Sequence, residues 1–151
     1  MVVGSMSRDL ILLDTHIWLW WIFGDARVGN AGVRLLIHEG EHAHRLCISA
    51  ISIWEALLLN EAGRIRIDGD LRAWLREARE KFVVATLPVD ERVALESRLL
   101  PGVFHSDPGD RFIVATARIT GASLVTADRR ILEYADAGNV RAVDLAGEPH
   151  A

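Results

Sequence analysis

The sequence predicts one α/β domain built on a mostly parallel central sheet of four or five strands, with helices on both faces of the sheet. Short apolar runs alternate with segments of helical periodicity along the chain, which is typical of repeated βα units. The first run, residues 10–13, is continuously apolar, as in a strand that is buried on both faces. The chain has 151 residues, half of them hydrophobic, which is enough for one core and hardly for two.

The expected strands are short, mainly apolar segments, most of them followed directly by a polar or turn residue. Apart from the first, these segments are too short to show a clear periodicity, so we assign them as strands mainly because they lie between helical segments. Connections of this kind run right-handed from one parallel strand to the next, so the strands should form one sheet. The predicted strands cover residues 10–13, 46–48, 82–87, 123–126 and 140–143.

The expected helices have apolar residues three or four positions apart and lie between turn signals. The clearest periodicity is in residues 70–81, which predicts an amphipathic helix. Asp107 followed by Pro108 is a common helix start, and Gly63 is a common helix end. The first predicted helix begins at about Thr15, and the third runs from Ser49 or Ser52 to about residue 62. The other predicted helices cover residues 31–39, 70–81, 89–99 and 107–120.

The ends of the chain and its composition restrict the class of protein. We expect residues 1–9 to be a flexible segment, 10–145 to form the domain and 146–151 to be a tail. No apolar stretch reaches the length of a membrane span, and residues 1–9 do not resemble a secretory signal, so we expect a cytoplasmic protein with no membrane partner. The single cysteine, Cys47, excludes an internal disulfide and a cysteine zinc cage. The net charge of −4 argues against a protein that coats nucleic acid by bulk attraction.

Four acidic residues occupy positions where a parallel sheet places its ligands. Asp14 directly follows the first strand, and Asp128 follows the fourth. Asp110 lies in the first turn of the helix that Asp107 begins, and Glu55 is early in the helix after the second strand. Because ligands bind at the carboxyl edge of such sheets, we expect the four carboxylates to meet there.

Several carboxylates without a histidine or cysteine cage are the donor set expected for a hard divalent ion. Mg²⁺ fits best, with Mn²⁺ as a substitute, and four acids suffice for one or two ions. Such ions lower the pKa of a bound water and stabilise negative charge on a phosphate. The pattern therefore indicates hydrolysis of a phosphodiester bond.

Each acid also has a purely structural interpretation. Asp107 can serve only as an N-cap, Asp110 can interact with the helix dipole, Ser52 with Glu55 spells a capping box, and Asp128 can be a turn residue. Asp14 is harder to explain in this way, because an acid at the end of a buried strand is unfavourable unless it is paired or liganded.

Four motifs resemble, in order and spacing, those of PIN-domain proteins, specifically the VapC-type toxins of bacterial type II toxin-antitoxin systems. The first is Leu-Leu-Asp-Thr-His at 12–16, and the second is Ser-Ala-Ile-Ser-Ile-Trp-Glu at 49–55. The third is Asp-Pro-Gly-Asp-Arg-Phe-Ile-Val-Ala-Thr-Ala at 107–117, and the fourth is Leu-Val-Thr-Ala-Asp at 124–128. The resemblance extends over about residues 10–145. Gly109 departs from the pattern, since many relatives have a larger residue there.

This resemblance implies a PIN fold and a metal-dependent endoribonuclease that acts on RNA as a toxin and is silenced by a cognate, VapB-like antitoxin. It implies that Thr126 orients Asp128 through its hydroxyl group. The residues it assigns to catalysis and metal binding are Asp14, Glu55, Asp110 and Asp128, with Thr15, Thr126 and Asp107 in supporting positions.

Other functions remain open at this point. A PIN-domain RNA-processing nuclease without a toxin role would use the same site, and a non-catalytic PIN-like binding module would need only the fold. A haloacid-dehalogenase-type phosphatase is disfavoured, because His16 stands where that class needs a second aspartate and Lys81 is the only lysine.

Tryptophans suggest where partners bind. Trp18, Trp20 and Trp21 cannot all face the same side of one helix, and Trp74 lies on the amphipathic 70–81 segment. We therefore expect a groove between the first helix and residues 70–81 that receives an antitoxin peptide, and a separate surface that forms a homodimer.

Overall fold

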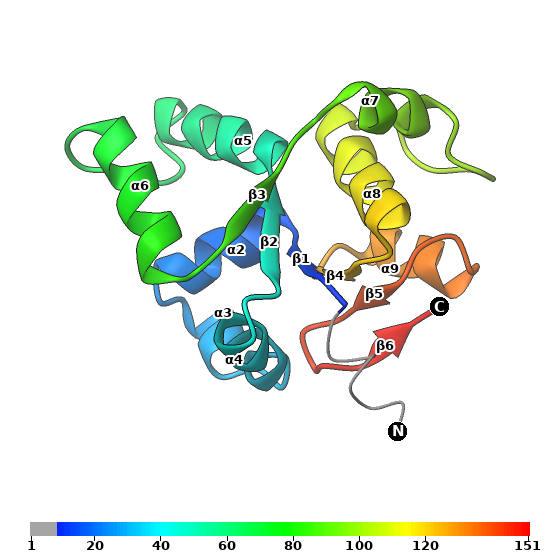
Figure 1. Ribbon diagram of the computed structural model, residues 1–151, viewed down its shortest axis with the longest axis horizontal. Helices are drawn as coiled ribbons and strands as arrows, with labels where there is room; N and C mark the ends of the chain where they lie inside the picture. The colour runs from blue at the N-terminus through cyan, green and yellow to red at the C-terminus, as the bar shows by residue number, and fades with distance from the viewer. Residues whose placement is uncertain (1–8) are drawn as a thin grey trace.

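A computed structural model describes residues 9–151 and shows a six-stranded sheet in the order β3-β2-β1-β4-β5-β6 (Figure 1). The proposed flexible segment 1–9 lies almost entirely outside these residues. The sheet divides the helices into two layers, which confirms the predicted α/β architecture. The strands are β1 (Ile11–Leu13), β2 (Leu46–Ser49), β3 (Ala85–Leu87), β4 (Ser123–Val125), β5 (Ala142–Val143) and β6 (Pro149–His150).

The first five strands run parallel to their neighbours. In the centre of the sheet, Ile11 of β1 pairs with Leu46 of β2 on one side and with Ser123 of β4 on the other. The last strand, β6, pairs antiparallel with β5 and places His150 opposite Ala142. The sheet thus has one strand more than the four or five predicted, and that strand lies within the segment 146–151, which was expected to be a tail.

The helices match most of the predicted segments but add two. Both α3 and α9 were not anticipated, and α4 begins three residues later than the predicted 31–39 segment. Within residues 9–151, no helix is both long enough and apolar enough to cross a membrane. The helices are α2 (Thr15–Ile22), α3 (Ala26–Gly29), α4 (Arg34–His42), α5 (Ala50–Glu61), α6 (Leu71–Lys81), α7 (Glu91–Arg98), α8 (Pro108–Thr120) and α9 (Arg129–Asp136).

Alternate side chains of the strands point to two separate hydrophobic clusters. On one face Leu12 and Leu124 pack with buried residues of α7, α8 and α9, among them Ile113. On the other face Ile11 and Leu13 pack with residues of α2, α4 and α5. Because successive strand residues face opposite sides, the two clusters account for the continuously apolar β1. Burial of the sheet between them fixes the positions of the strand ends.

Several helices begin directly at the carboxyl edge of the sheet, each with a polar N-cap. Asp14 caps α2 and accepts a hydrogen bond from the backbone N–H of Thr15. Ser49, Asp107 and Asp128 cap α5, α8 and α9 in the same manner. Side-chain oxygens that cap a helix satisfy its free N–H groups, so these polar residues are required at the edge for local reasons alone.

Candidate metal centre

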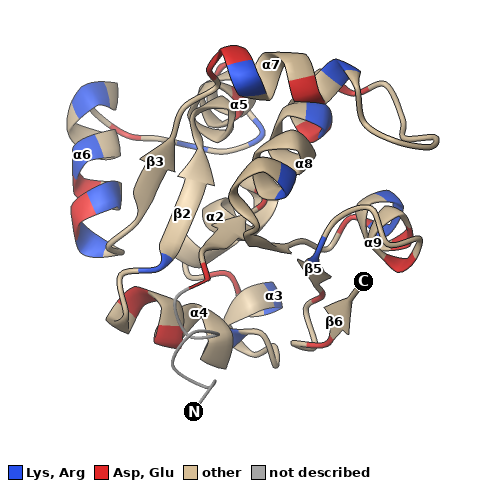
Figure 2. Cartoon of the chain, turned by 45° about the vertical axis from the view of Figure 1, so that its right-hand side comes forward, with Lys and Arg blue, Asp and Glu red and all other residues tan. Residues whose placement is uncertain are grey.

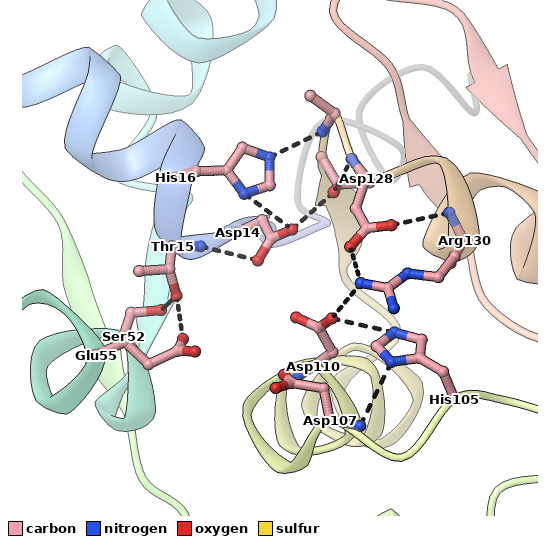
Figure 3. Close-up of polar contacts among 12 residues, drawn as sticks. Asp14, Thr15, His16, Ser52, Glu55, His105, Asp107, Asp110, Asp128 and Arg130 are labelled. Carbon is pink, nitrogen blue, oxygen red and sulfur yellow. Dashed lines mark hydrogen bonds and ion pairs between the residues drawn. The ribbon is translucent and has the colours of Figure 1, made fainter. Parts of the chain in front are cut away.

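The candidate site lies at the carboxyl ends of β1 and β4, the two strands at the centre of the sheet. From β1 the chain first builds β2 and β3 on one side, and later crosses to β4 on the other side. The loops that leave two such strands diverge and leave a crevice between them, where ligands of open α/β sheets bind. Figure 3 shows the polar side chains that converge on this crevice from α2, α5, α8 and α9.

Asp14 is the most buried acid of the site, with 3% of its surface exposed. Its Oδ1 accepts the Thr15 backbone N–H at 2.9 Å, and its Oδ2 accepts the Thr126 hydroxyl at 2.7 Å. The Thr126 oxygen in turn accepts the backbone N–H of Asp128 at 3.0 Å. The Thr126 hydroxyl therefore contacts both acids, because it donates to the Asp14 carboxylate and accepts the backbone N–H of Asp128. The Asp128 carboxylate itself caps α9.

His16 supports Asp14 from the second position of α2. Its Nε2 accepts the backbone N–H of Ala127 at 3.1 Å, so the ring hydrogen is on Nδ1. Nδ1 lies 3.5 Å from Asp14 Oδ2. The histidine thus links the ends of β1 and β4 and faces the carboxylate with a hydrogen-bond donor, an arrangement that fixes the orientation of a ligand.

Asp110 projects from the first turn of α8, three residues after the N-cap. Asp107 Oδ2 accepts the Asp110 backbone N–H at 2.9 Å, which confirms Asp107 as the N-cap. Asp110 Oδ2 lies 3.0 Å from Nε2 of His105, and His105 Nδ1 accepts the Asp107 backbone N–H at 3.4 Å. His105 Nε2 is enclosed and forms no hydrogen bond within residues 9–151, although Asp110 Oδ2 lies close to it.

Asp128 faces Asp110 across the crevice. Its Oδ1 accepts the backbone N–H of Arg130 at 2.8 Å, and its Oδ2 lies 3.5 Å from the Arg130 guanidinium. The same guanidinium lies 3.9 Å from Asp110 Oδ2, and the Arg130 side chain is 60% exposed. The interpretation of Asp128 as a turn residue is therefore incomplete, because it begins a helix whose second residue reaches back over the site.

Glu55 approaches from the middle of α5, on the opposite side of Asp14. Its Oε1 accepts the Thr15 hydroxyl at 2.6 Å, and the Thr15 and Ser52 hydroxyls lie 2.7 Å apart. The capping-box interpretation of Ser52 and Glu55 is wrong, because α5 begins earlier and Ser49 caps it. The Glu55 carboxylate is thus free of any helix-capping role, and the Thr15 hydroxyl donates a hydrogen bond to it.

Burial, together with the neighbouring carboxylates, raises the pKa values of Asp110 and Glu55. Burial, followed by the charges of Asp14, Asp107, Asp128 and Glu55, raises the pKa of Asp110 from 3.8 to about 8. Burial is also the main reason that the Glu55 pKa is raised, although its bond from Thr15 acts in the opposite direction. A raised carboxyl pKa means that the site disfavours a further negative charge. Such a site is suited to binding a cation.

The donor geometry fits a divalent ion. Ligand atoms of His105, Asp110 and Asp128 all lie within 4.8 Å of one another. Ligands about 2.1 Å from a common ion lie up to roughly 4.2 Å apart, so small side-chain movements would complete such a site. Asp14 and Glu55 are outside this tight group, although both flank it. The structure therefore brings all four predicted acids to one edge, but in two pairs. Asp110 and Asp128 belong to the tight group, whereas Asp14 and Glu55 lie beside it and are both hydrogen-bonded to Thr15.

Sequence reasoning missed His105 and Arg130. The only signal for His105 was its place two residues before the Asp107 N-cap, which holds it against the first turn of α8. Arg130 could have been found only if α9 had been predicted, because a helix beginning at Asp128 turns its second residue toward the crevice. Cys47, in contrast, is buried in β2, where burial raises its thiol pKa to about 12 and excludes it as a nucleophile.

The acidic crevice on a parallel sheet defines a class that the comparisons with known proteins identify. The family model for the PIN domain matches residues 11–137, and the chain belongs to this family. Among curated proteins, the chain is 37% identical over 124 residues to Ribonuclease VapC22 of Mycobacterium tuberculosis. The aligned residues make up 82% of this chain and 91% of the relative.

Solved structures share the fold at lower sequence identity. A DNA-bound VapBC from Salmonella typhimurium matches with a TM-score of 0.63 and 20% identity, covering 91% of this chain and 98% of that one. VapBC2 from Rickettsia felis, bound to a fragment of its promoter DNA, matches with a TM-score of 0.60 and 15% identity over 89% and 98% of the two chains. A toxin-antitoxin complex from Klebsiella pneumoniae gives 0.55 and 16% over 80% and 89%.

Proposed function

We propose that this chain is a Mg²⁺-dependent endoribonuclease that acts in the cytoplasm as the toxin of a toxin-antitoxin pair. The observation that carries the proposal is the convergence of Asp14, Glu55, Asp110 and Asp128 at one sheet edge, where burial and the neighbouring carboxylates raise the Asp110 pKa to about 8. The name of the relative VapC22, a ribonuclease, and the VapBC complexes among the structural matches support the same activity and role.

The four carboxylates would hold one or two Mg²⁺ ions, and Mn²⁺ would be accepted as well. When bound, such an ion lowers the pKa of a water molecule and stabilises negative charge on the phosphate. Thr126 and His16 keep the Asp14 carboxylate in a fixed orientation. Hydrogen-bonded ligands of this kind are held in place before the ion binds, which reduces the entropy lost on binding.

Arg130 is suited to contact the RNA backbone. Its guanidinium is at the rim of the crevice and largely exposed, so it can form a bidentate contact with a phosphate beside the bound ion. Elsewhere, positive and negative segments are interspersed on α6 and α7 (Figure 2), in keeping with the net charge of −4. We therefore expect Arg130→Gln to raise the KM for RNA, while Arg129→Gln, a change at the exposed neighbouring residue, has little effect.

An antitoxin segment would bind between the end of α2 and α6. A groove of about 180 Å³ there is lined by Ile22, Phe23, Trp74 and Phe82. Trp18 is fully buried and packs against Trp74 with ring centroids 5.9 Å apart. The most exposed tryptophan is Trp54 on α5, outside this groove. The proposed groove thus agrees with the expected position, but Trp74 also contributes to the core.

A homodimer would use a different surface. Leu95, Leu99 and Val103 are exposed by 62%, 63% and 95%, and they lie on α7 and in the segment that follows it. A second copy would remove this apolar area from water. Light scattering on the wild type and on Leu99→Glu would test it, since a charge in the interface should produce a monomer.

The deciding experiment is cleavage of a labelled RNA with Mg²⁺, with chelator, and by Asp110→Asn. A nuclease cuts only in the first case, whereas a binding module binds RNA in all three without cutting it. Expression with and without the neighbouring reading frame then separates a toxin from an RNA-processing enzyme. Growth arrest that the neighbouring protein relieves supports the toxin role, and normal growth contradicts it.

A further inference from the structure

Gly109, the second residue of α8, has no backbone reason to be glycine. It is buried, its backbone is helical, and its φ is not in the left-handed region that favours glycine. In a helix, glycine destabilises the chain relative to alanine because it loses more backbone entropy on folding. Another requirement must therefore explain the absence of a side chain at this position.

The Glu55 carboxylate occupies the space of the missing side chain. A Cβ atom built on Gly109 would lie 2.5 Å from Glu55 Oε2 and 3.0 Å from its Cδ. Real Cβ atoms do not approach other heavy atoms this closely, so a side chain at 109 and this position of Glu55 exclude each other. The nearest further atom, Asp107 Oδ2, would be at 3.4 Å, which is almost normal contact.

The other oxygen of the same carboxylate is held from the opposite side. Oε1 accepts the Thr15 hydroxyl at 2.6 Å, and Thr15 also contacts Ser52. Glu55 is therefore fixed between the first turn of α2 and the first turn of α8, although it comes from the middle of α5 (Figure 3). Neither contact is part of a helix cap.

We propose that Gly109 is a positioning residue, which admits the Glu55 carboxylate against the first turn of α8 and so sets its place in the metal site. This rests on the proposed function insofar as Glu55 is a metal ligand. A methyl group at 109 would displace the carboxylate from the Thr15 hydroxyl. Since the flexible end of Glu55 is what moves, the fold itself should tolerate the change.

The test is a double-mutant cycle at positions 109 and 55, with Mn²⁺ binding measured by calorimetry. We expect Gly109→Ala to weaken Mn²⁺ binding by about tenfold in the wild-type background, and by less than about twofold when Glu55 is already alanine. Gly29→Ala in α3 is the matched control, because a Cβ there would meet no atom within 4 Å. It should leave the affinity unchanged.

Thermal melts in chelator give a second, metal-independent measurement. In the Glu55→Ala background the new methyl group is unopposed, so Gly109→Ala should raise Tm by about 2–4 °C as ordinary helix propensity predicts. With Glu55 present the gain should be absent. Equal effects of Gly109→Ala in both backgrounds, on affinity and on Tm, would overturn the proposal. Failure of the wild type to bind Mn²⁺ would contradict the proposed function, while the melts would still decide the role of Gly109.

Discussion

Replacement of Asp110 by asparagine should stabilise the metal-free protein while it abolishes RNA cleavage. The folded state raises the Asp110 pKa from 3.8 to about 8, so it binds this proton more tightly than the unfolded chain does. Stability from this group is therefore complete below about pH 4 and is lost as the pH rises toward 8. Asparagine keeps the shape and the hydrogen-bonding oxygen but does not ionise.

The size of the effect follows from the pKa difference. Each pKa unit corresponds to about 1.4 kcal/mol, which gives an upper bound of about 4 kcal/mol at pH 7. The Asp110 side chain retains 16% exposure, so we expect solvent and relaxation to reduce this to about 2 kcal/mol. For a chain of this size that is a Tm increase of about 6 °C at pH 7 and about 2 °C at pH 5.

The assay is a set of melts followed by circular dichroism in chelator between pH 5 and 8. Asp68→Asn is the control, because the Asp68 side chain is 80% exposed and away from the crevice. Mg²⁺ should then raise the Tm of the wild type more than that of Asp110→Asn, since only binding to the folded state stabilises it. A variant that melts lower than the wild type in chelator, or a difference that does not grow with pH, would refute the reasoning.

Three further changes test other parts of the structure. Thr126→Val removes the buried hydroxyl that binds Asp14, and we expect urea unfolding to show a loss of about 1–3 kcal/mol together with weaker Mn²⁺ binding; unchanged stability would contradict this. The bond to Asp144 is the main reason that the His150 pKa is raised, so this bond stabilises β6 below the ordinary pKa of 6.5 and is lost as the pH rises through the raised value. Hydrogen exchange in β6 should accordingly be faster at pH 9 than at pH 6 after correction for intrinsic rates, and His150→Gln should abolish the difference. Burial raises the Cys47 pKa to about 12, so iodoacetamide at pH 8 should modify this thiol only in denaturant, as mass spectrometry would show.

Much of the fold could be predicted because the central strands β1, β2 and β4 are buried on both faces and are followed by, or end at, a polar residue. The apolar run of β1 and the Asp107 start of α8 are local signals, and both are confirmed by the structure. The segment of α9 was missed because it is short and begins with two arginines, so its apolar positions Ile131 and Ala135 were not recognised as helical. The two residues of β6 form a strand only because β5 offers a free edge and His150 contacts α9 and the preceding turn.

The sequence by itself determined which acids could reach the site, because an acid that follows a parallel strand or begins a helix at its carboxyl edge has a place set by chain connectivity. It could not decide what these acids contact, since those contacts join residues that are far apart in the chain. Thr126 binds Asp14 across 112 positions, and Glu55 lies against Gly109 from another helix. Such pairs depend on the packing of two hydrophobic layers on one sheet. Close packing fixes the helix ends relative to one another far more precisely than spacing along the chain can indicate.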